Sequence, residues 1–269
     1  MVARIIRYGK LALKKIRQIY INVLIKRLEL TGFEVFKKDS EKHYVLNYFG
    51  RSSHKQINIR TLPIFGELAD LVIQDRRTTL YYDRLFTIYQ IIEYLKNSKH
   101  DGRLQMAEIG VYKGGTSYFI ATAAQKLGLL YTHSCFDTFE GHPKSDINRS
   151  IETTHVAGSF RDTSYEAVSE YLSIFKDVKV YKGRFQDTCQ VLEDEILQFA
   201  YLDMDIYEPT IFALNYLNNK IIKGGVILLD DYGFASCPGI EKAVKEFTQV
   251  NGNYFGISLL SGQYILIKL

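Results

Sequence analysis

The sequence predicts an α/β fold built on a doubly wound, mostly parallel seven-stranded sheet. Short apolar runs alternate with helical patterns from Leu104 to Val250, a spacing typical of βαβ units. The last two apolar runs, Phe255–Leu260 and Tyr264–Leu269, are joined by only three residues. This link is too short for a helical crossover, so we expect an antiparallel hairpin at the end of the sheet.

The elements follow from the spacing of apolar residues and from glycine and proline breaks. Before the hairpin, the predicted strands are Leu104–Ile109, Thr132–Asp137, Val178–Tyr181, Phe199–Asp203 and Val226–Asp230. The predicted helices are Leu80–Leu95, Thr116–Leu127, Tyr165–Phe175, Thr188–Leu197, Pro209–Asn219 and Gly239–Val250. Lys223-Gly-Gly225 would end the helix before the fifth strand, because glycine suits a helix C-terminus.

Composition and charge favour an ordinary globular protein. The chain has 269 residues, 46% of them hydrophobic, which excludes disorder of the whole chain. A formal charge of +4 is small for this length and does not indicate nucleic-acid binding. We expect two parts: a basic N-terminal extension with its connection over residues 1–60, and an α/β domain over residues 61–269.

The N-terminal extension is basic and interleaved with apolar residues, as in one or two amphipathic helices. No acidic residue precedes Glu29, and the basic residues up to Leu28 are Arg4, Arg7, Lys10, Lys14, Lys15, Arg17, Lys26 and Arg27. Packing on its own domain or on a second subunit of a homo-oligomer is the favoured interpretation. Peripheral contact of residues 1–28 with an anionic membrane surface is the alternative. Residues 37–61 read as a connection with a short strand at Tyr44–Phe49.

Cysteine usage and hydropathy point to a cytoplasmic protein. Cys135, Cys189 and Cys237 are odd in number and lack the paired spacing of zinc or redox sites, so we expect reduced thiols. The sequence contains no apolar run long enough to span a bilayer and no secretory signal pattern. Peripheral association with the inner face of the membrane remains the alternative localisation.

Two aspartate pairs end two successive strands. Asp203 and Asp205 follow the fourth predicted strand, and Asp230 and Asp231 follow the fifth. The carboxyl ends of neighbouring parallel strands meet where open α/β sheets bind ligands. Because clustered carboxylates repel one another, a divalent cation between them is the first candidate.

The loop between the first strand and its helix lies where α/β folds of this kind bind a nucleotide. Glu108 and Gly110 are followed by glycines only at 114 and 115, whereas a dinucleotide site would have G-x-G-x-x-G to bind phosphates. A ligand without phosphates but with positive charge, such as S-adenosylmethionine, suits this loop better. Asp137, at the end of the second strand, is placed to accept the ribose hydroxyls; capping a loop is its alternative role.

Five ordered motifs resemble those of the macrocin O-methyltransferase family. They are Glu108–Gly115, Phe136–Gly141, Gly183–Thr188, Leu202–Glu208 and Leu229–Tyr232, and the resemblance extends from about Arg76 to Phe247. It implies a Rossmann-like class I methyltransferase fold, S-adenosylmethionine as cofactor, Mg²⁺, and methylation of a sugar hydroxyl in a natural product or glycan.

The resemblance also implies roles for individual residues. Asp203, Asp230 and Asp231 would be the metal ligands. The residues expected to bind the cofactor are Thr78, Glu108, Gly110, Gly114, Asp137, Gln186 and Asp187. Position 142 is histidine where an apolar residue is expected, and Pro209 replaces an expected serine, which leaves the acceptor open.

Catalysis then needs a group that accepts the proton of the hydroxyl. Asp203 is the first candidate and His142 the second, while Asp205 is expected to cap the helix after it. The long polar segment Pro143–Ser164 is expected to cover the acceptor. Three other functions compete: a nicotinamide-dependent enzyme, a non-catalytic membrane-associated binding protein of the same fold, and an RNA methyltransferase. The last is disfavoured, because the positive charge concentrates in the first 28 residues.

Overall fold

The computed structural model describes residues 15, 17–28, 30–31, 59–98 and 102–269. The chain divides into two compact units, Met1–His43 and Tyr44–Leu269. Their boundary falls among residues outside these ranges, so the division at residue 60 stays a prediction, and the strand expected at Tyr44–Phe49 also lies outside them. No helix among the described residues is long and apolar enough to cross a membrane.

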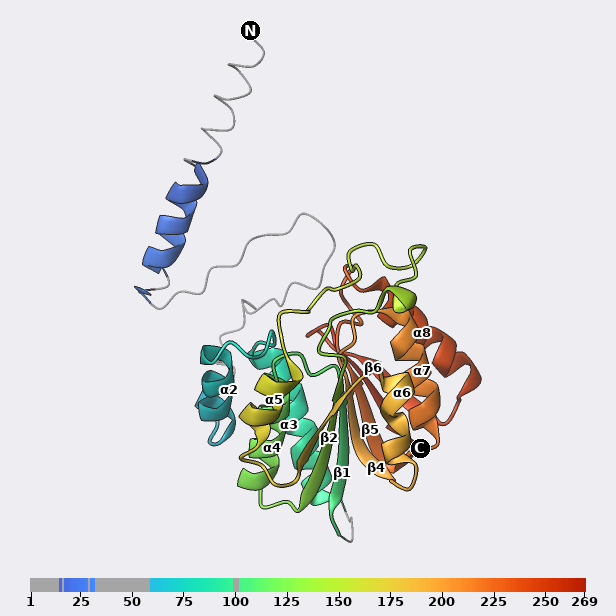
Figure 1. Ribbon diagram of the computed structural model, residues 1–269. Helices are drawn as coiled ribbons and strands as arrows, with labels where there is room; N and C mark the ends of the chain where they lie inside the picture. The colour runs from blue at the N-terminus through green and yellow to red at the C-terminus, as the bar shows by residue number, and fades with distance from the viewer. Residues whose placement is uncertain (1–14, 16, 29, 32–58, 99–101) are drawn as a thin grey trace. The chain divides into compact units, whose positions relative to one another are not determined.

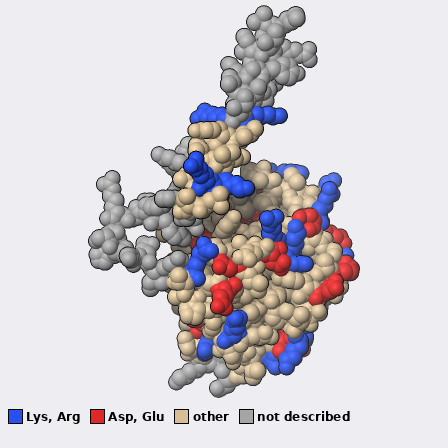
Figure 2. Space-filling model, turned by 90° about the vertical axis from the view of Figure 1, so that its left-hand side faces the viewer, with Lys and Arg blue, Asp and Glu red and all other residues tan. Residues whose placement is uncertain are grey.

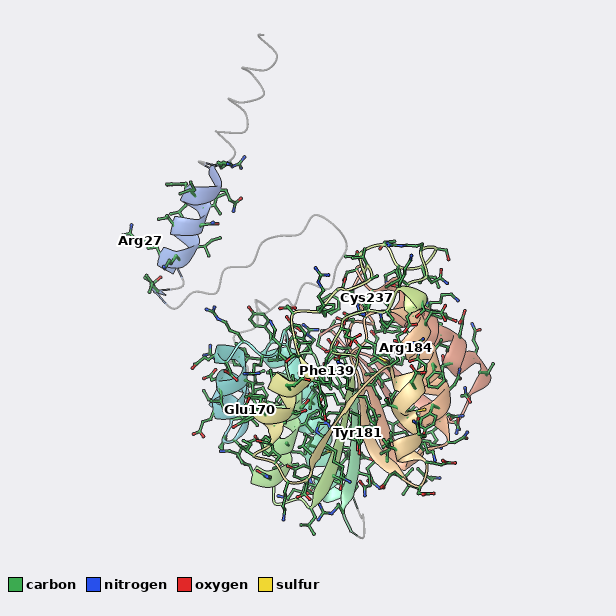
Figure 3. The ribbon with its side chains drawn as sticks, in the orientation of Figure 1. Arg27, Phe139, Glu170, Tyr181, Arg184 and Cys237 are labelled. Atoms are coloured by element: carbon green, nitrogen blue, oxygen red, sulfur yellow. The ribbon has the colours of Figure 1, made fainter. Side chains whose placement is uncertain are left out.

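The described part of the N-terminal extension is helical over residues 17–28. Several large apolar side chains of this segment are exposed, among them Ile19, Tyr20, Val23 and Leu24. Basic residues such as Arg27 flank them (Figure 3). The predicted helix is therefore confirmed over this stretch, while membrane contact and self-association stay predictions.

The second unit is built on a seven-stranded sheet in the order β3-β2-β1-β4-β5-β7-β6 (Figure 1). The strands are β1 Leu104–Ile109, β2 Tyr131–Asp137, β3 Val178–Lys182, β4 Leu197–Leu202, β5 Ile221–Leu229, β6 Tyr254–Ser258 and β7 Tyr264–Lys268. The first five strands pair in parallel. β7 runs antiparallel to both β5 and β6, which confirms the predicted terminal hairpin.

Helices cover both faces of this sheet (Figure 1). On one face lie α2 Phe65–Gln74, α3 Tyr82–Asn97, α4 Gly115–Lys126 and α5 Tyr165–Leu172. On the other lie α6 Phe185–Thr188, α7 Tyr207–Asn218 and α8 Pro238–Val250. Short 3₁₀ turns complete the unit at η1 Ile59–Thr61, η2 Lys144–Asp146 and η3 Cys189–Leu192. Each face has its own apolar core, and every residue of β4 is buried, as expected for a central parallel strand.

The structure corrects two of the predicted features and adds one helix. The helix expected at Thr188–Leu197 is the short α6 followed by η3, which ends at Leu192. Lys223-Gly-Gly225 does not end a helix but lies inside β5, where the β4–β5 register shifts between Leu197 and Phe199; glycines accommodate such a bulge. α2 was not predicted, although its apolar residues have helical spacing and it buries five residues, including Phe65.

Register brings the functional loops to one edge of the sheet. Ile109 of β1 lies beside Leu202 of β4, which in turn lies beside Leu229 of β5. Backbone hydrogen bonds continue one residue further, from Asp203 N to Ile109 O and from Asp230 N to Leu202 O, both 2.9 Å. The loop after β1 and both aspartate pairs therefore leave the sheet side by side.

Candidate active site

A cavity of about 380 Å³ opens at the carboxyl ends of the parallel strands, a size typical of small-molecule sites. Residues from all of these loops line it, together with the segments around Thr78 and Arg184. Figure 3 labels two lining residues, Arg184 and Cys237, at the upper end of the sheet as drawn. The cavity has two chemically different halves, described in turn below.

The glycine loop after β1 forms the first half. Gly110 has a φ of +94°, and a Cβ at this position would lie 1.8 Å from the backbone oxygen of Asp203. Gly115 is equally confined, since its Cβ would lie 2.5 Å from the carbonyl carbon of Arg77. Glycine is thus required both for the turn and for the close approach of β4 and of the segment that carries Thr78.

Gly110→Ala is expected to destabilise the protein by roughly 2–5 kcal/mol, because it combines an unfavourable φ with a backbone clash. Gly128→Ala is the matched control: Gly128 has a φ of +75°, but nothing lies within 4 Å of the added Cβ. We expect that control to lose only about 1 kcal/mol. Chemical denaturation of both variants measures the difference, and equal losses would show that the contact with Asp203 is unimportant.

Asp137 organises this loop through its carboxylate. Oδ2 accepts hydrogen bonds from the backbone N–H groups of Val111 and Tyr112, both at 2.8 Å, and Oδ1 accepts one from Phe139 N at 2.7 Å. The loop-capping role is therefore present. Asp137 also lines the cavity, so a contact with a ribose remains compatible with its position.

Gln186 and Thr78 complete the cofactor half. Both line the cavity, and Thr78 Oγ1 lies 3.0 Å from Thr116 Oγ1 of α4. The Gln186 side-chain oxygen is buried and finds no hydrogen-bond partner among the described residues. A buried unpaired acceptor in a cavity wall calls for a donor from a water molecule or a ligand, and the exocyclic amino group of an adenine is such a donor.

Three predicted cofactor residues do not line the cavity. Glu108 is fully buried within β1, with Oε2 3.3 Å from His133 Nε2 on β2. Gly114 precedes α4 in a left-handed conformation. The side chain of Asp187 is 65% exposed and faces Arg184 at 3.9 Å. The structure places these three around the cavity rather than in its wall.

The second half of the cavity is acidic. One carboxylate oxygen from each of Asp203, Asp230 and Asp231 lies within 4.8 Å of the other two. Asp203, Asp205 and Asp231 line the cavity, whereas Asp230 lies behind them and is 1% exposed. Asp205 and Asp231 have φ values of +61° and +58°, and such backbone strain in non-glycine residues is concentrated at functional sites.

Burial and mutual repulsion change the acidity of these groups. Burial and the neighbouring Asp230 carboxylate raise the pKa of Asp203 well above its usual range. Burial and Asp231 do the same to the pKa of Asp205. Burial raises the pKa of Asp230 to about 7, although Arg84 opposes the shift. The acidic half therefore has more negative charge than its surroundings stabilise, and hard oxygen donors in this arrangement fit a divalent cation such as Mg²⁺.

Arg84 is a residue of the cavity wall that sequence reasoning missed. It lies in the first turn of α3, and its Nη1 contacts Asp230 Oδ2 and lies 3.5 Å from Asp231 Oδ1. Gln263, between β6 and β7, donates from Nε2 to Asp230 Oδ1 at 2.9 Å. Neither residue belongs to a motif, so only the folded chain shows that they bind this aspartate.

The expectation that Asp205 caps the following helix is wrong. The N-cap of α7 is Ile206, which has no side-chain cap, and Tyr207 N donates instead to Glu152 Oε1 at 2.8 Å. Asp205 faces the cavity, with Oδ2 3.7 Å from His142 Nε2 and Oδ1 3.9 Å from Cys237 Sγ. A distant buried glutamate thus caps the helix and leaves the Asp205 carboxylate for the site.

Two histidines lie beside Asp205 in the cavity wall. His142 Nε2 lies 3.3 Å from His155 Nδ1, and His155 Nε2 lies 3.4 Å from Cys237 Sγ. Burial and the neighbouring His155 lower the pKa of His142 to about 4, so its imidazole is neutral near pH 7. His155 and Phe160, whose rings stack at 5.9 Å, come from the segment expected to cover the acceptor, and both line the cavity.

Comparison with known proteins agrees with this arrangement. The profile described as Macrocin-O-methyltransferase (TylF) matches residues 76–257. The chain belongs to the macrocin O-methyltransferase family. As a member of this family it is an S-adenosylmethionine-dependent O-methyltransferase with a class I methyltransferase fold.

Characterised relatives of this family are distant in sequence. Demethyldecarbamoylnovobiocin O-methyltransferase of Streptomyces niveus is 28% identical over 63% of this chain and 67% of its own length. Mycinamicin III 3''-O-methyltransferase of Micromonospora griseorubida is 24% identical over 82% of this chain and 91% of its own length. The solved O-methyltransferase NovP has a TM-score of 0.60 at 23% identity, over 71% of this chain and 82% of its own, which supports the fold.

Proposed function

We propose that this enzyme methylates a hydroxyl of a sugar unit in a natural product or glycan, in a reaction that requires a divalent cation such as Mg²⁺. The observation that carries the proposal is the junction of a cofactor half and an acidic half in one cavity. Two relatives support the acceptor class by their names, since mycinamicin III and demethyldecarbamoylnovobiocin are natural products.

In the cofactor half, chain atoms provide binding and orientation. We propose that Asp137 accepts the ribose hydroxyls and that Gln186 Oε1 accepts the adenine amino group. Thr78, which lies beside Thr116, would cover the cofactor. Glu108, Gly114 and Asp187 would act from positions outside the cavity wall. S-adenosylmethionine supplies the methyl group, and holding donor and acceptor in line provides much of the rate.

In the acidic half, Asp203, Asp230 and Asp231 are the proposed metal ligands. The cation would lower the pKa of a coordinated hydroxyl and orient it. Asp203 and Asp231 present their carboxylates to the cavity directly, while Asp230 completes the set from behind.

The proton acceptor is proposed among groups that face this region. Asp203 is the first candidate. His142 is the second, but its pKa of about 4 makes it a weak base. Asp205 is a further candidate, because its buried carboxylate has a raised pKa and is not among the proposed ligands. A pH–rate profile for Asp205→Asn beside His142→Gln distinguishes them. A proton acceptor acts only when it is deprotonated, so the true acceptor is the residue whose loss removes the acidic limb of the profile.

Removal of divalent ions is expected to abolish methyl transfer. Release of S-adenosylhomocysteine, measured after treatment with EDTA, should fall to background and return on addition of Mg²⁺. Because bound cation relieves repulsion among the aspartates, Mg²⁺ should also raise Tm. Undiminished activity in excess chelator would disprove the metal requirement while leaving the methyltransferase assignment intact.

The face drawn in Figure 2 does not have the charge pattern expected of an RNA-binding surface. On the face drawn in Figure 2, Lys and Arg side chains of the catalytic unit are interspersed with Asp and Glu, whereas RNA-binding proteins present a continuous basic surface. Family membership also disfavours a nicotinamide-dependent enzyme and a non-catalytic binding protein of the same fold.

A further inference from the structure

Arg84 is a cation already present in the acidic half of the cavity. Its Nη1 group contacts Asp230 Oδ2 and lies 3.5 Å from Asp231 Oδ1. Its side chain is only 16% exposed. The other terminal nitrogen, Nη2, donates to the backbone oxygen of Thr79 at 3.3 Å, and the ring of Phe234 lies 5.4 Å from the guanidinium carbon. The guanidinium is therefore held in place on several sides.

This contact occupies a proposed metal ligand. Asp230 Oδ2 contacts Arg84, and its other oxygen, Oδ1, accepts the hydrogen bond from Gln263. A divalent cation that binds Asp230 and Asp231 must share these oxygens with the guanidinium or displace it. Two cations a few ångströms apart in a partly desolvated cavity repel each other strongly.

We propose that Arg84 is a built-in counter-cation that stabilises the metal-free acidic half and competes with the divalent ion for Asp230 and Asp231. The proposal rests on the metal requirement proposed above. Arg84 thereby sets the affinity of the site for metal. Its positive charge reduces repulsion among the aspartates when metal is absent, and the same charge weakens the binding of a divalent cation. The enzyme then binds its metal only when the free cation concentration is high enough to displace the guanidinium.

Metal binding to three variants of the full chain tests the proposal. Arg84→Gln removes the charge, and Arg84→Lys retains it. Arg103→Gln removes an arginine from an ion pair with Asp177, at 2.8 Å, whose residues do not line the cavity. Calorimetry with Mg²⁺ and electron paramagnetic resonance with Mn²⁺ should show at least about tenfold tighter binding to Arg84→Gln. Arg84→Lys and Arg103→Gln should bind within about threefold of the wild type.

The increase of Tm on adding Mg²⁺ should also be larger for Arg84→Gln than for the wild type. Equal or weaker Mg²⁺ binding by Arg84→Gln, beside measurable binding by the wild type, would overturn the role of Arg84 alone. If neither protein binds the ion, there is no competition and the proposal falls. Chelator-insensitive methyl transfer in the same proteins would then show that the metal requirement is also wrong.

A measurement on the wild type covers the case in which Arg84→Gln does not fold. The guanidinium Nε–H signal of Arg84 in an NMR spectrum should exchange slowly with solvent in the metal-free protein. Saturating Mg²⁺ should accelerate this exchange, because the side chain loses its contact with Asp230. An exchange rate unchanged by saturating Mg²⁺ would contradict the proposal.

Discussion

Asp203→Asn is expected to abolish methyl transfer and, at the same time, to stabilise the metal-free protein. Asparagine keeps the shape of the side chain but removes a negative charge that faces Asp230 and Asp231. We expect turnover to fall by at least about 10³-fold, since both a proposed ligand and the proposed proton acceptor are lost. Release of S-adenosylhomocysteine measures the first effect, and thermal unfolding measures the second.

The stabilisation should depend on pH with a defined sign. The pKa of Asp203 is raised in the folded protein, so between the unfolded value of about 4 and the folded value the native state binds more protons than the unfolded state. The free energy of unfolding of the wild type therefore decreases as pH rises through this window. Asparagine has no ionisable group, so the variant does not lose this stability. In EDTA, the Tm of Asp203→Asn should exceed that of the wild type by an amount that increases from pH 4 to pH 8.

The exposed acid Asp194, which does not line the cavity, supplies the control. Asp194→Asn should have the activity and the Tm of the wild type. In saturating Mg²⁺ the advantage of Asp203→Asn should shrink or reverse, since the wild type then gains the cation. An active Asp203→Asn enzyme would refute the roles given to this residue. A lower Tm in EDTA at every pH would refute the repulsion argument.

Asp137→Ala is expected to weaken the binding of S-adenosylhomocysteine by at least about 100-fold. The substitution leaves the N–H groups of Val111, Tyr112 and Phe139 without their acceptor and removes the proposed ribose partner. Calorimetric titration measures the loss of affinity, and chemical denaturation measures the accompanying loss of stability.

A comparison with Asp137→Asn separates the two roles of this side chain. Asparagine retains one oxygen for the loop but presents an amide instead of a carboxylate. We expect its affinity for S-adenosylhomocysteine to lie between those of the wild type and Asp137→Ala. If Asp137→Ala were destabilised yet bound S-adenosylhomocysteine normally, Asp137 would be a loop cap and not a cofactor ligand.

Most of the fold could be predicted because its strands are set by local pattern. The first four parallel strands and the terminal hairpin lie within about two residues of their predicted bounds, since buried parallel strands are continuous apolar runs. β5 is also present, but it begins at Ile221 instead of Val226. The failures occur where tertiary context overrides propensity. Gly224 and Gly225 look like a helix end, but they lie in β5 at a register shift, which only the pairing with β4 reveals.

The site could be predicted only where its residues lie in contiguous motifs. Gly110, Asp137 and Asp203 stand at strand ends in sequence and in space. Glu108 has the spacing of a cofactor residue, yet its side chain is buried beside His133 rather than in the cavity wall. Adjacent strand residues point to opposite faces of the sheet, so closeness in sequence did not ensure closeness to the cavity.

By itself the sequence determined the class of the protein: an α/β methyltransferase fold with a glycine loop and four aspartates at one edge of the sheet. The alternation of strands and helices, the spacing of glycines and the acids at strand ends are local properties of the sequence. They can be recognised without knowing how the side chains pack. Only the tertiary structure shows which residues form ion pairs and hydrogen bonds with those aspartates. Arg84 reaches Asp230 from 146 positions away, and Glu152 caps α7 in place of Asp205. A buried charge is costly unless an opposite charge or a hydrogen-bond donor lies beside it. Which residue supplies that partner depends on the fold and not on closeness in sequence.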